Sequence, residues 1–162
     1  MTRLHVPIRL RWSDLDAYGH VNNARLLTLF EEARIRAFWA TDEGVESDLI
    51  GVGDANPAVL EFGAGTSTQM VIAAQQVAYL TPVPFLRHPL DIEMWIGRLG
   101  GASLDVYYEV YSPAGVEPRV RFAMAKTSIV LVDAVTGRPT RFGERERAAW
   151  SPYTDDPLEF RR

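Results

Sequence analysis

The chain has 162 residues, of which 47% are hydrophobic and 23% charged, and its formal net charge is −4 at pH 7. This size and composition predict a single folded domain over residues 1–162, and the acidic balance argues against a nucleic-acid partner, which needs a basic surface. Cysteine is absent and only three histidines occur, so disulfides, thiolate nucleophiles and cysteine zinc sites are excluded and no metal site is expected.

Residues 4–12 alternate apolar and polar side chains, which predicts a first strand with Pro7 at an edge position. No long apolar run marks a signal peptide, and nowhere do about 20 apolar residues run together as a membrane-spanning helix requires. These features predict a cytoplasmic protein with no membrane partner.

Turn-forming and cap-forming residues fill positions 13–23, and the apolar period then becomes that of a helix. Asn22 or Asn23 suits the N-cap, so a helix is predicted over roughly 23–40. The apolar positions of this helix fall on one face and are Leu26, Leu29, Phe30, Ala33 and Ala37.

Residues 41–68 show no clear period and are predicted to be an irregular insertion or a lid. Four strands are then predicted as a meander, with a hairpin signal at Gly100-Gly101. Their ranges are 70–80, 90–99, 104–111 and 119–132. Residues 140–162 form a C-terminal extension with a short helix expected over 144–150.

This order of elements predicts an α+β fold in which an antiparallel sheet of about five strands wraps around one long central helix. One helix leaves the other sheet face and the sheet edges exposed. Self-association, as a homodimer or a homotetramer, is expected to cover these exposed surfaces.

Two segments give the chain a specific resemblance. Asp14-Leu15-Asp16-Ala17-Tyr18-Gly19-His20-Val21-Asn22-Asn23 and Phe30-Glu31-Glu32-Ala33-Arg34 resemble the signature of hotdog-fold thioesterases of the 4-hydroxybenzoyl-CoA thioesterase type. The resemblance implies the hotdog fold and the hydrolysis of an acyl-CoA, or acyl-carrier, thioester to free acid and thiol. Coenzyme A would then be part of the substrate, and no resident cofactor is expected.

Carried over from that family, Asp16 matches the catalytic carboxylate and Asn23 matches the position whose backbone N–H polarises the thioester carbonyl. Asp16 could attack the acyl carbon or deprotonate water, and the sequence does not separate these routes. Free amides near Val21–Asn23 at the start of the helix could hold the oxyanion. Thiolate is a good leaving group, so no strong general acid is required.

Several neighbouring residues have two interpretations. His20 either lines the site and orients Asp16 or is an ordinary structural histidine, and Asn22 either holds water or caps the helix. Glu31 either faces the substrate or forms an ion pair with Arg34. The residues expected to bind substrate are Tyr18, Gly19, Val21, Leu27 and Glu31.

The main alternative function is a hotdog protein that binds acyl-CoA or fatty acid without hydrolysing it. A dehydratase is a weaker alternative, because its catalytic histidine typically belongs to a differently spaced motif. The cations that could meet the coenzyme A phosphates are Arg87, His88, Arg98, Arg119, Arg121 and Lys126, and no local pattern selects among them.

Overall fold

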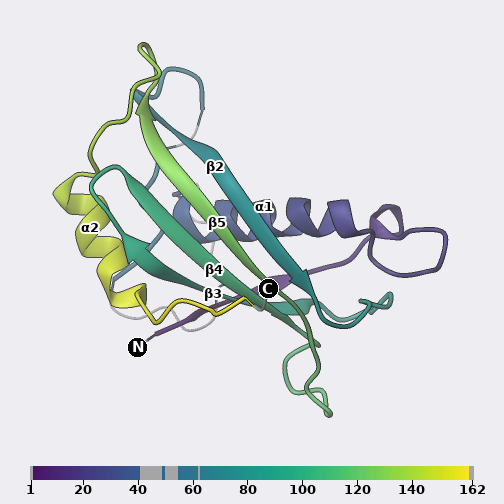
Figure 1. Cartoon of the computed structure of the whole chain (residues 1–162). Coiled ribbons are helices and arrows are strands. Elements are labelled where there is room, and N and C mark those ends of the chain that lie inside the picture. The colour runs from purple at the N-terminus through teal and green to yellow at the C-terminus, as the bar shows by residue number, and fades with distance from the viewer. Residues whose placement is uncertain (1, 41–48, 50–54, 62, 161–162) are drawn as a thin grey trace.

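A computed structural model describes residues 2–40, 49, 55–61 and 63–160 of the chain. It contains a five-stranded antiparallel sheet with one helix lying across a single face (Figure 1). The elements in chain order are β1 (Leu4–Ile8), η1 (Trp12–Asp14), α1 (Asn23–Phe38), β2 (Thr68–Tyr79), β3 (Leu90–Leu99), β4 (Ser103–Tyr111), β5 (Arg121–Asp133), α2 (Glu144–Trp150) and η2 (Ser151–Tyr153). Every predicted strand and both predicted helices are present.

The order of the strands across the sheet is β1-β3-β4-β5-β2, so the predicted four-strand meander is wrong for β2. Only β3, β4 and β5 follow one another as a meander. One edge of β3 is already occupied by β1, whereas the free edge of the 13-residue β5 pairs with β2 along almost its whole length. The 12-residue β2 therefore forms one edge of the sheet.

Strict alternation of side chains divides the sheet into a core face and an outer face. In β4, Leu104, Val106 and Tyr108 belong to the hydrophobic core, whereas Asp105 and Glu109 point to the outer face and take part in ion pairs. The strands β1 and β3 follow the same rule. The alternation predicted for residues 4–12 is therefore confirmed over β1.

Helix α1 lies against the core face but is shorter than the long central helix that was expected, at 16 residues. Its buried stripe includes Leu26, Leu29 and Phe30, and the Phe30 ring lies 4.8 Å from that of Tyr108 in β4. The position of Arg34 does not match the ion pair with Glu31 that was one interpretation of the sequence. Arg34 forms no ion pair with Glu31 but is buried and donates hydrogen bonds to the Tyr108 hydroxyl (3.1 Å) and to Thr127.

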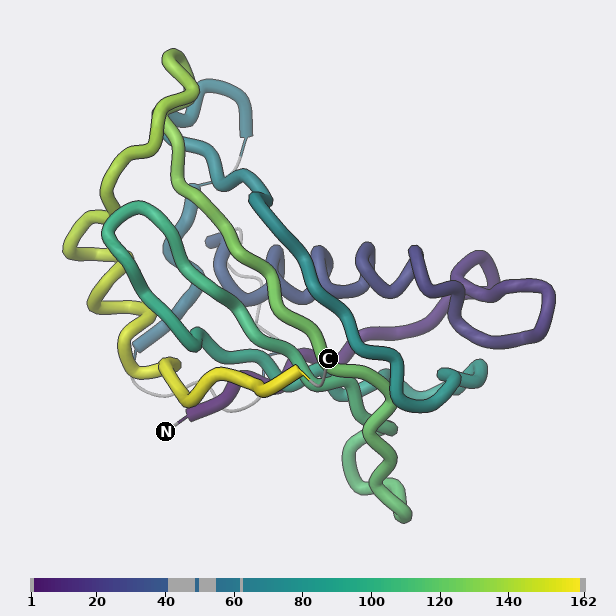
Figure 2. Tube along the Cα trace, viewed as in Figure 1, coloured from purple at the N-terminus to yellow at the C-terminus, as the bar shows by residue number. Residues whose placement is uncertain are grey.

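The C-terminal extension packs onto the domain through α2 and the residues after it. Trp150 is fully buried against Phe38 at the end of α1, and its indole N–H donates to the Pro57 carbonyl at 2.9 Å. Figure 2 shows the yellow C-terminal stretch running back beside the strands after α2. There Thr154 pairs with Ile96 of β3, on the side that β1 occupies further along the same strand.

Half of the predicted irregular insertion over residues 41–68, namely residues 41–48, 50–54 and 62, lies outside the described residues. The part that is described, residues 55–61 and 63–67, has no regular secondary structure apart from one bridge between Leu60 and Trp39. No helix within the described ranges is both long and apolar enough to cross a membrane.

Candidate functional site

A tight turn between η1 and α1 holds Asp16. The Asp16 backbone N–H donates to the His20 carbonyl at 2.7 Å, and Gly19 takes a positive φ of 77° that lets the chain reverse. One carboxylate oxygen, Oδ1, accepts the backbone N–H groups of Tyr18 at 2.8 Å and His20 at 3.2 Å. The other oxygen accepts no hydrogen bond from any described residue, so it is free to meet a ligand.

Asn22 is the N-cap of α1, because its Oδ1 accepts the backbone N–H of Ala24 at 2.9 Å. The amides expected to hold an oxyanion are only partly free. The N–H of Val21 donates to the Val83 carbonyl and that of Asn22 to the Asp14 carbonyl, both at 2.8 Å. The Asn23 N–H has no acceptor among the described residues and lies at the positive end of the helix dipole.

A cavity of about 580 Å³ brings part of the expected site together. Its lining residues come from the turn, the start of α1, the end of β2 with the residues that follow it, and β5. They are Asp16, His20, Val21, Asn23, Leu26, Tyr79, Leu80, Thr81, Pro82, Val83, Phe122 and Ala123.

The other expected site residues do not line this cavity. Tyr18 is 86% exposed on the outside of the turn, and Gly19 and Glu31 are also exposed. Asn22 faces a different shallow hollow beside Ser13 and Arg25. Gly19, Leu27 and Glu31 line neither the first cavity nor this hollow.

The segment after β2 was not predicted to belong to the site. Tyr79 is half exposed and its hydroxyl donates to the Asn23 carbonyl at 3.0 Å, which ties the end of β2 to the first turn of α1. The run from Tyr79 to Val83 then forms the opposite wall of the cavity. Its turn-forming prolines were the signal that could have identified it.

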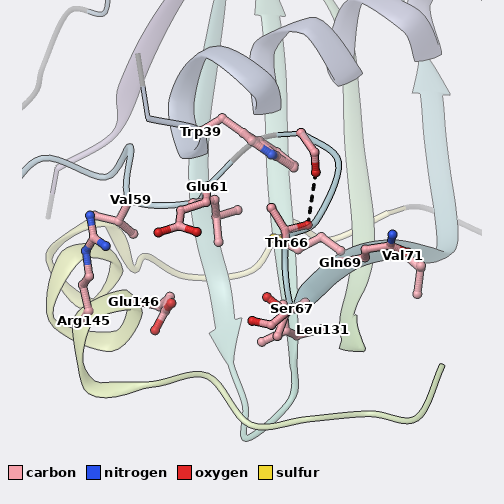
Figure 3. A pocket seen from close by; sticks show the side chains of 14 residues that line it. Trp39, Val59, Glu61, Thr66, Ser67, Gln69, Val71, Leu131, Arg145 and Glu146 are labelled. Atoms are coloured by element: carbon pink, nitrogen blue, oxygen red, sulfur yellow. Dashed lines mark hydrogen bonds between the residues drawn. The ribbon is translucent and has the colours of Figure 1, made fainter. Parts of the chain in front are cut away.

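A second cavity, of about 500 Å³, lies at the other end of α1 and of β2 (Figure 3). Trp39 follows the helix there, Gln69 and Val71 come from the start of β2, and Arg145 and Glu146 come from α2. Its lining carries more charge than that of the first cavity. None of the expected catalytic residues reaches it.

One group of described residues has the donor set of a metal site, and the expectation that no metal binds stays a prediction. The ligand atoms of His5, Asp91 and Glu93 lie within 4.8 Å of one another on the outer face of the sheet. Arg119, however, donates to both carboxylates at 2.8 Å, so a guanidinium already supplies the positive charge between them.

The candidate cations for a phosphate ligand separate into two groups. The cations on the sheet and just before β5 are paired with acids. Arg98 and Lys126 pair with Asp105, Arg119 pairs with Asp91 and Glu93, and Arg121 pairs with Glu109. Arg87 and His88, in the turn before β3, form no ion pair with any described residue. Of the six candidates, these two are therefore available for a ligand.

Together, the first cavity offers a carboxylate with one free oxygen and a free backbone amide at a helix N-terminus. Such an arrangement suits attack on a polarised carbonyl, because the carboxylate can act as nucleophile or base while the amide holds the developing oxyanion. Apolar residues such as Leu26 and Phe122 line the remainder and suit an acyl group.

Comparison with known proteins points the same way. Residues 10–150 match the family model of the thioesterase-like superfamily. A thioesterase from Thermus thermophilus, solved in complex with coenzyme A and Zn, is 27% identical with a TM-score of 0.64, and the match covers 96% of each chain. No curated protein is significantly similar in sequence to the chain.

Two further solved structures share the fold at lower identity. A predicted thioesterase from Bacillus stearothermophilus is 22% identical with a TM-score of 0.69, over 96% of this chain and 99% of its own. A DHNA-CoA thioesterase from Staphylococcus aureus is 14% identical with a TM-score of 0.69, over 94% of this chain and 91% of its own.

Proposed function

The chain belongs to the thioesterase-like superfamily, and from that premise we propose that it hydrolyses an acyl-CoA thioester at the first cavity, with Asp16 as the catalytic carboxylate. One observation carries the assignment of the site. Asp16, which has a carboxylate oxygen without a described donor, and Asn23, which has a backbone N–H without a described acceptor, both line the same partly apolar cavity. Neither residue belongs to the lining of the second cavity.

In the proposed reaction the thioester carbonyl oxygen points at the Asn23 N–H, which stabilises the negative charge that develops on it. Asp16 either attacks the acyl carbon, expelling the thiolate and forming an anhydride that water cleaves, or takes a proton from the water that attacks. His20 lines the cavity beside Asp16, and its backbone N–H helps to fix the carboxylate. The chemistry requires no resident cofactor.

The experiment that tests this proposal is a thiol-release assay on short, medium, long and aromatic acyl-CoAs. The Asp16→Asn variant should lose about 100-fold or more in kcat, the scale of a lost general base or nucleophile. Asp133→Asn is a matched control, because the Asp133 carboxylate also accepts two backbone N–H groups in a turn but does not belong to the cavity lining.

Full turnover by Asp16→Asn would remove Asp16 from the mechanism. Tight binding of acyl-CoA by the wild-type protein, with no thiol released over hours, would instead identify a carrier or sensor that uses the same cavity. Acylated protein in an acid-quenched single turnover would identify Asp16 as the nucleophile rather than the base.

We also propose that the active form is a homodimer that pairs through β2. Strand β2 is an edge strand of 12 residues whose side chains are exposed on both faces, Val71 and Ile72 among them. The first cavity borders the end of β2 and the second borders its start, on the helix side. Antiparallel pairing of two β2 strands would place the second cavity of one copy beside the first cavity of the other.

A cytoplasmic location and the absence of a nucleic-acid partner remain predictions from the sequence. The same holds for the extent of the domain over residues 1–162.

A further inference from the structure

Two aromatic rings form an exposed stack at the beginning of η1. Trp12 is 75% exposed, and one face of its indole lies on the ring of Phe85, with the ring centroids 4.3 Å apart and the planes inclined by 10°. Phe85 is itself packed against the hydrophobic core. Because indoles are usually largely buried, an indole held flat with most of its surface in solvent suggests a ligand.

Both rings are mounted on the segments that form the walls of the first cavity. Phe85 follows Pro82 and Val83, which line the cavity, and Val83 is tied to Val21 by a backbone hydrogen bond. Trp12 precedes Asp16 by four residues, so their Cα atoms are at most about 14 Å apart. The aromatic stack therefore lies within reach of a substrate whose reacting carbonyl is at Asp16.

The base of η1 is rigid, so the position of the indole is defined. Asp14 is completely buried and accepts the backbone N–H of Arg11 at 2.7 Å as well as its guanidinium. The carbonyl of Asp14 accepts the Asn22 N–H, which connects η1 to the helix cap. The indole needs little further ordering when a ligand binds.

Two arginines lie close to the stacked rings of Trp12 and Phe85 in the sequence. Arg87 follows Phe85 by two residues and Arg9 precedes Trp12 by three; both are exposed and neither forms an ion pair with a described residue. Such a set of groups suits a nucleotide, because its base can stack on a ring while arginines close by in the chain meet its phosphates.

We propose that the free face of Trp12, supported from behind by Phe85, stacks the adenine of coenzyme A while Arg87 and Arg9 meet its phosphates. This inference rests on the proposed thioesterase function and narrows its substrate class. A carrier-protein thioester has the same pantetheine arm but no adenine, so the stack selects the coenzyme A ester.

The test compares the KM for one acyl group presented as acyl-CoA and as acyl-pantetheine, which lacks the nucleotide. Trp12→Ala should raise the KM for acyl-CoA about 10-fold, with a much smaller change for acyl-pantetheine, and Trp12→Phe should restore most of the loss. Val135→Ala, at a side chain that is 92% exposed and remote from the stack in sequence, is the control.

A binding measurement that needs no turnover accompanies the kinetics. Adenosine 3′,5′-bisphosphate should quench the tryptophan fluorescence of the wild-type protein, and Trp12→Phe should remove the quenching although three other tryptophans remain. Equal KM ratios in wild type and Trp12→Ala, or quenching that persists in Trp12→Phe, would overturn the proposal.

The two proposals fail in different ways. If no thioester is hydrolysed, the thioesterase proposal fails, and the fluorescence titration still decides whether the stack binds a nucleotide. If Trp12→Ala changes the sedimenting mass but leaves the KM ratio unaltered, the stack is a contact between copies and the nucleotide site is rejected.

Discussion

Asp105 joins three donors on the outer face of β4. Burial alone would raise the pKa of this carboxyl, but hydrogen bonds from Ser128, Arg98 and Lys126 outweigh it and hold the pKa below its usual range. The carboxylate therefore stabilises the folded state when it is ionised. This contribution is present above the unfolded-state pKa and is lost as the pH falls through the lower folded-state pKa.

The first prediction follows from the stabilising effect of the ionised Asp105 carboxylate. Asp105→Asn should lower the free energy of unfolding by about 1–3 kcal/mol at pH 7, and the difference from wild type should shrink as the pH falls below about 4. Urea unfolding at pH 7, 5 and 3 measures it, with the exposed Asp156→Asn as control. A penalty that stays constant over this range would show that the ionised carboxylate is not what stabilises the fold.

At the level of single residues, only part of the predicted site lines the first cavity, and the roles of these residues stay predictions. Asp16, His20 and Asn23 do border one cavity. Arg34 was expected on the helix surface, since its spacing from Glu31 suits an ion pair, but it turns inward to Tyr108. The spacing of residues along a helix cannot show that a strand 74 residues away in the sequence supplies a hydroxyl as the partner of Arg34.

Helix α1 depends on its first turn for both folding and the proposed chemistry. Asn22 satisfies the Ala24 amide, which has no partner within the helix, while the Asn23 amide stays free. A single turn thus combines a cap and the proposed oxyanion donor.

The second prediction separates these two roles. Asn22→Ala should cost about 1 kcal/mol of stability through loss of the cap, with a small decrease in kcat, and Asn22→Ser should recover most of the stability. Chemical denaturation and thiol release measure the two effects. A loss of kcat as large as that of Asp16→Asn would mean that Asn22 takes part in catalysis as well.

The third prediction concerns the edge strand. Ile72→Lys places a charge on an apolar position of β2 that is 44% exposed, and it should convert the proposed dimer to a monomer because the charge would be desolvated in the pairing. Analytical ultracentrifugation measures the mass. Val135→Lys, a similar change at a turn, should leave the mass unchanged, and an Ile72→Lys variant that stays dimeric would place the interface elsewhere.

The existence and approximate ends of the elements were predictable because period-two and helical patterns are local. The strand that pairs with β2 was not predictable, because the sequence of residues 80–89 does not indicate whether β3 lies beside β2 in the sheet. The pairing of β2 with β5 depends on the free edge of a strand that comes more than 40 residues later.

For the whole molecule, the C-terminal extension completes the core and is more than a surface appendage. Trp150 closes the end of α1 by packing on Phe38 and Phe142, with ring centroids 5.4 and 5.3 Å away. The sequence predicted the short helix but not its packing, because the partners of Trp150 come from three separate parts of the chain.

The fourth prediction is that Trp150→Ala lowers the free energy of unfolding by about 3–5 kcal/mol, since it opens a cavity and leaves the Pro57 carbonyl without its donor. Trp150→Phe should cost less, because the ring contacts survive. Denaturant unfolding of both variants measures the difference. A loss within about 0.5 kcal/mol would assign α2 to the surface.

The salt bridge between Arg3 and Asp155 (2.9 Å) brings the beginning and the end of the described chain together. A chain whose first strand and C-terminal segment lie close together can be circularly permuted. A short linker could join them, and new ends could be opened at the turn after β5, where Val135 is 92% exposed. The linear order of the elements would change while the cavity, with all its walls, stays assembled.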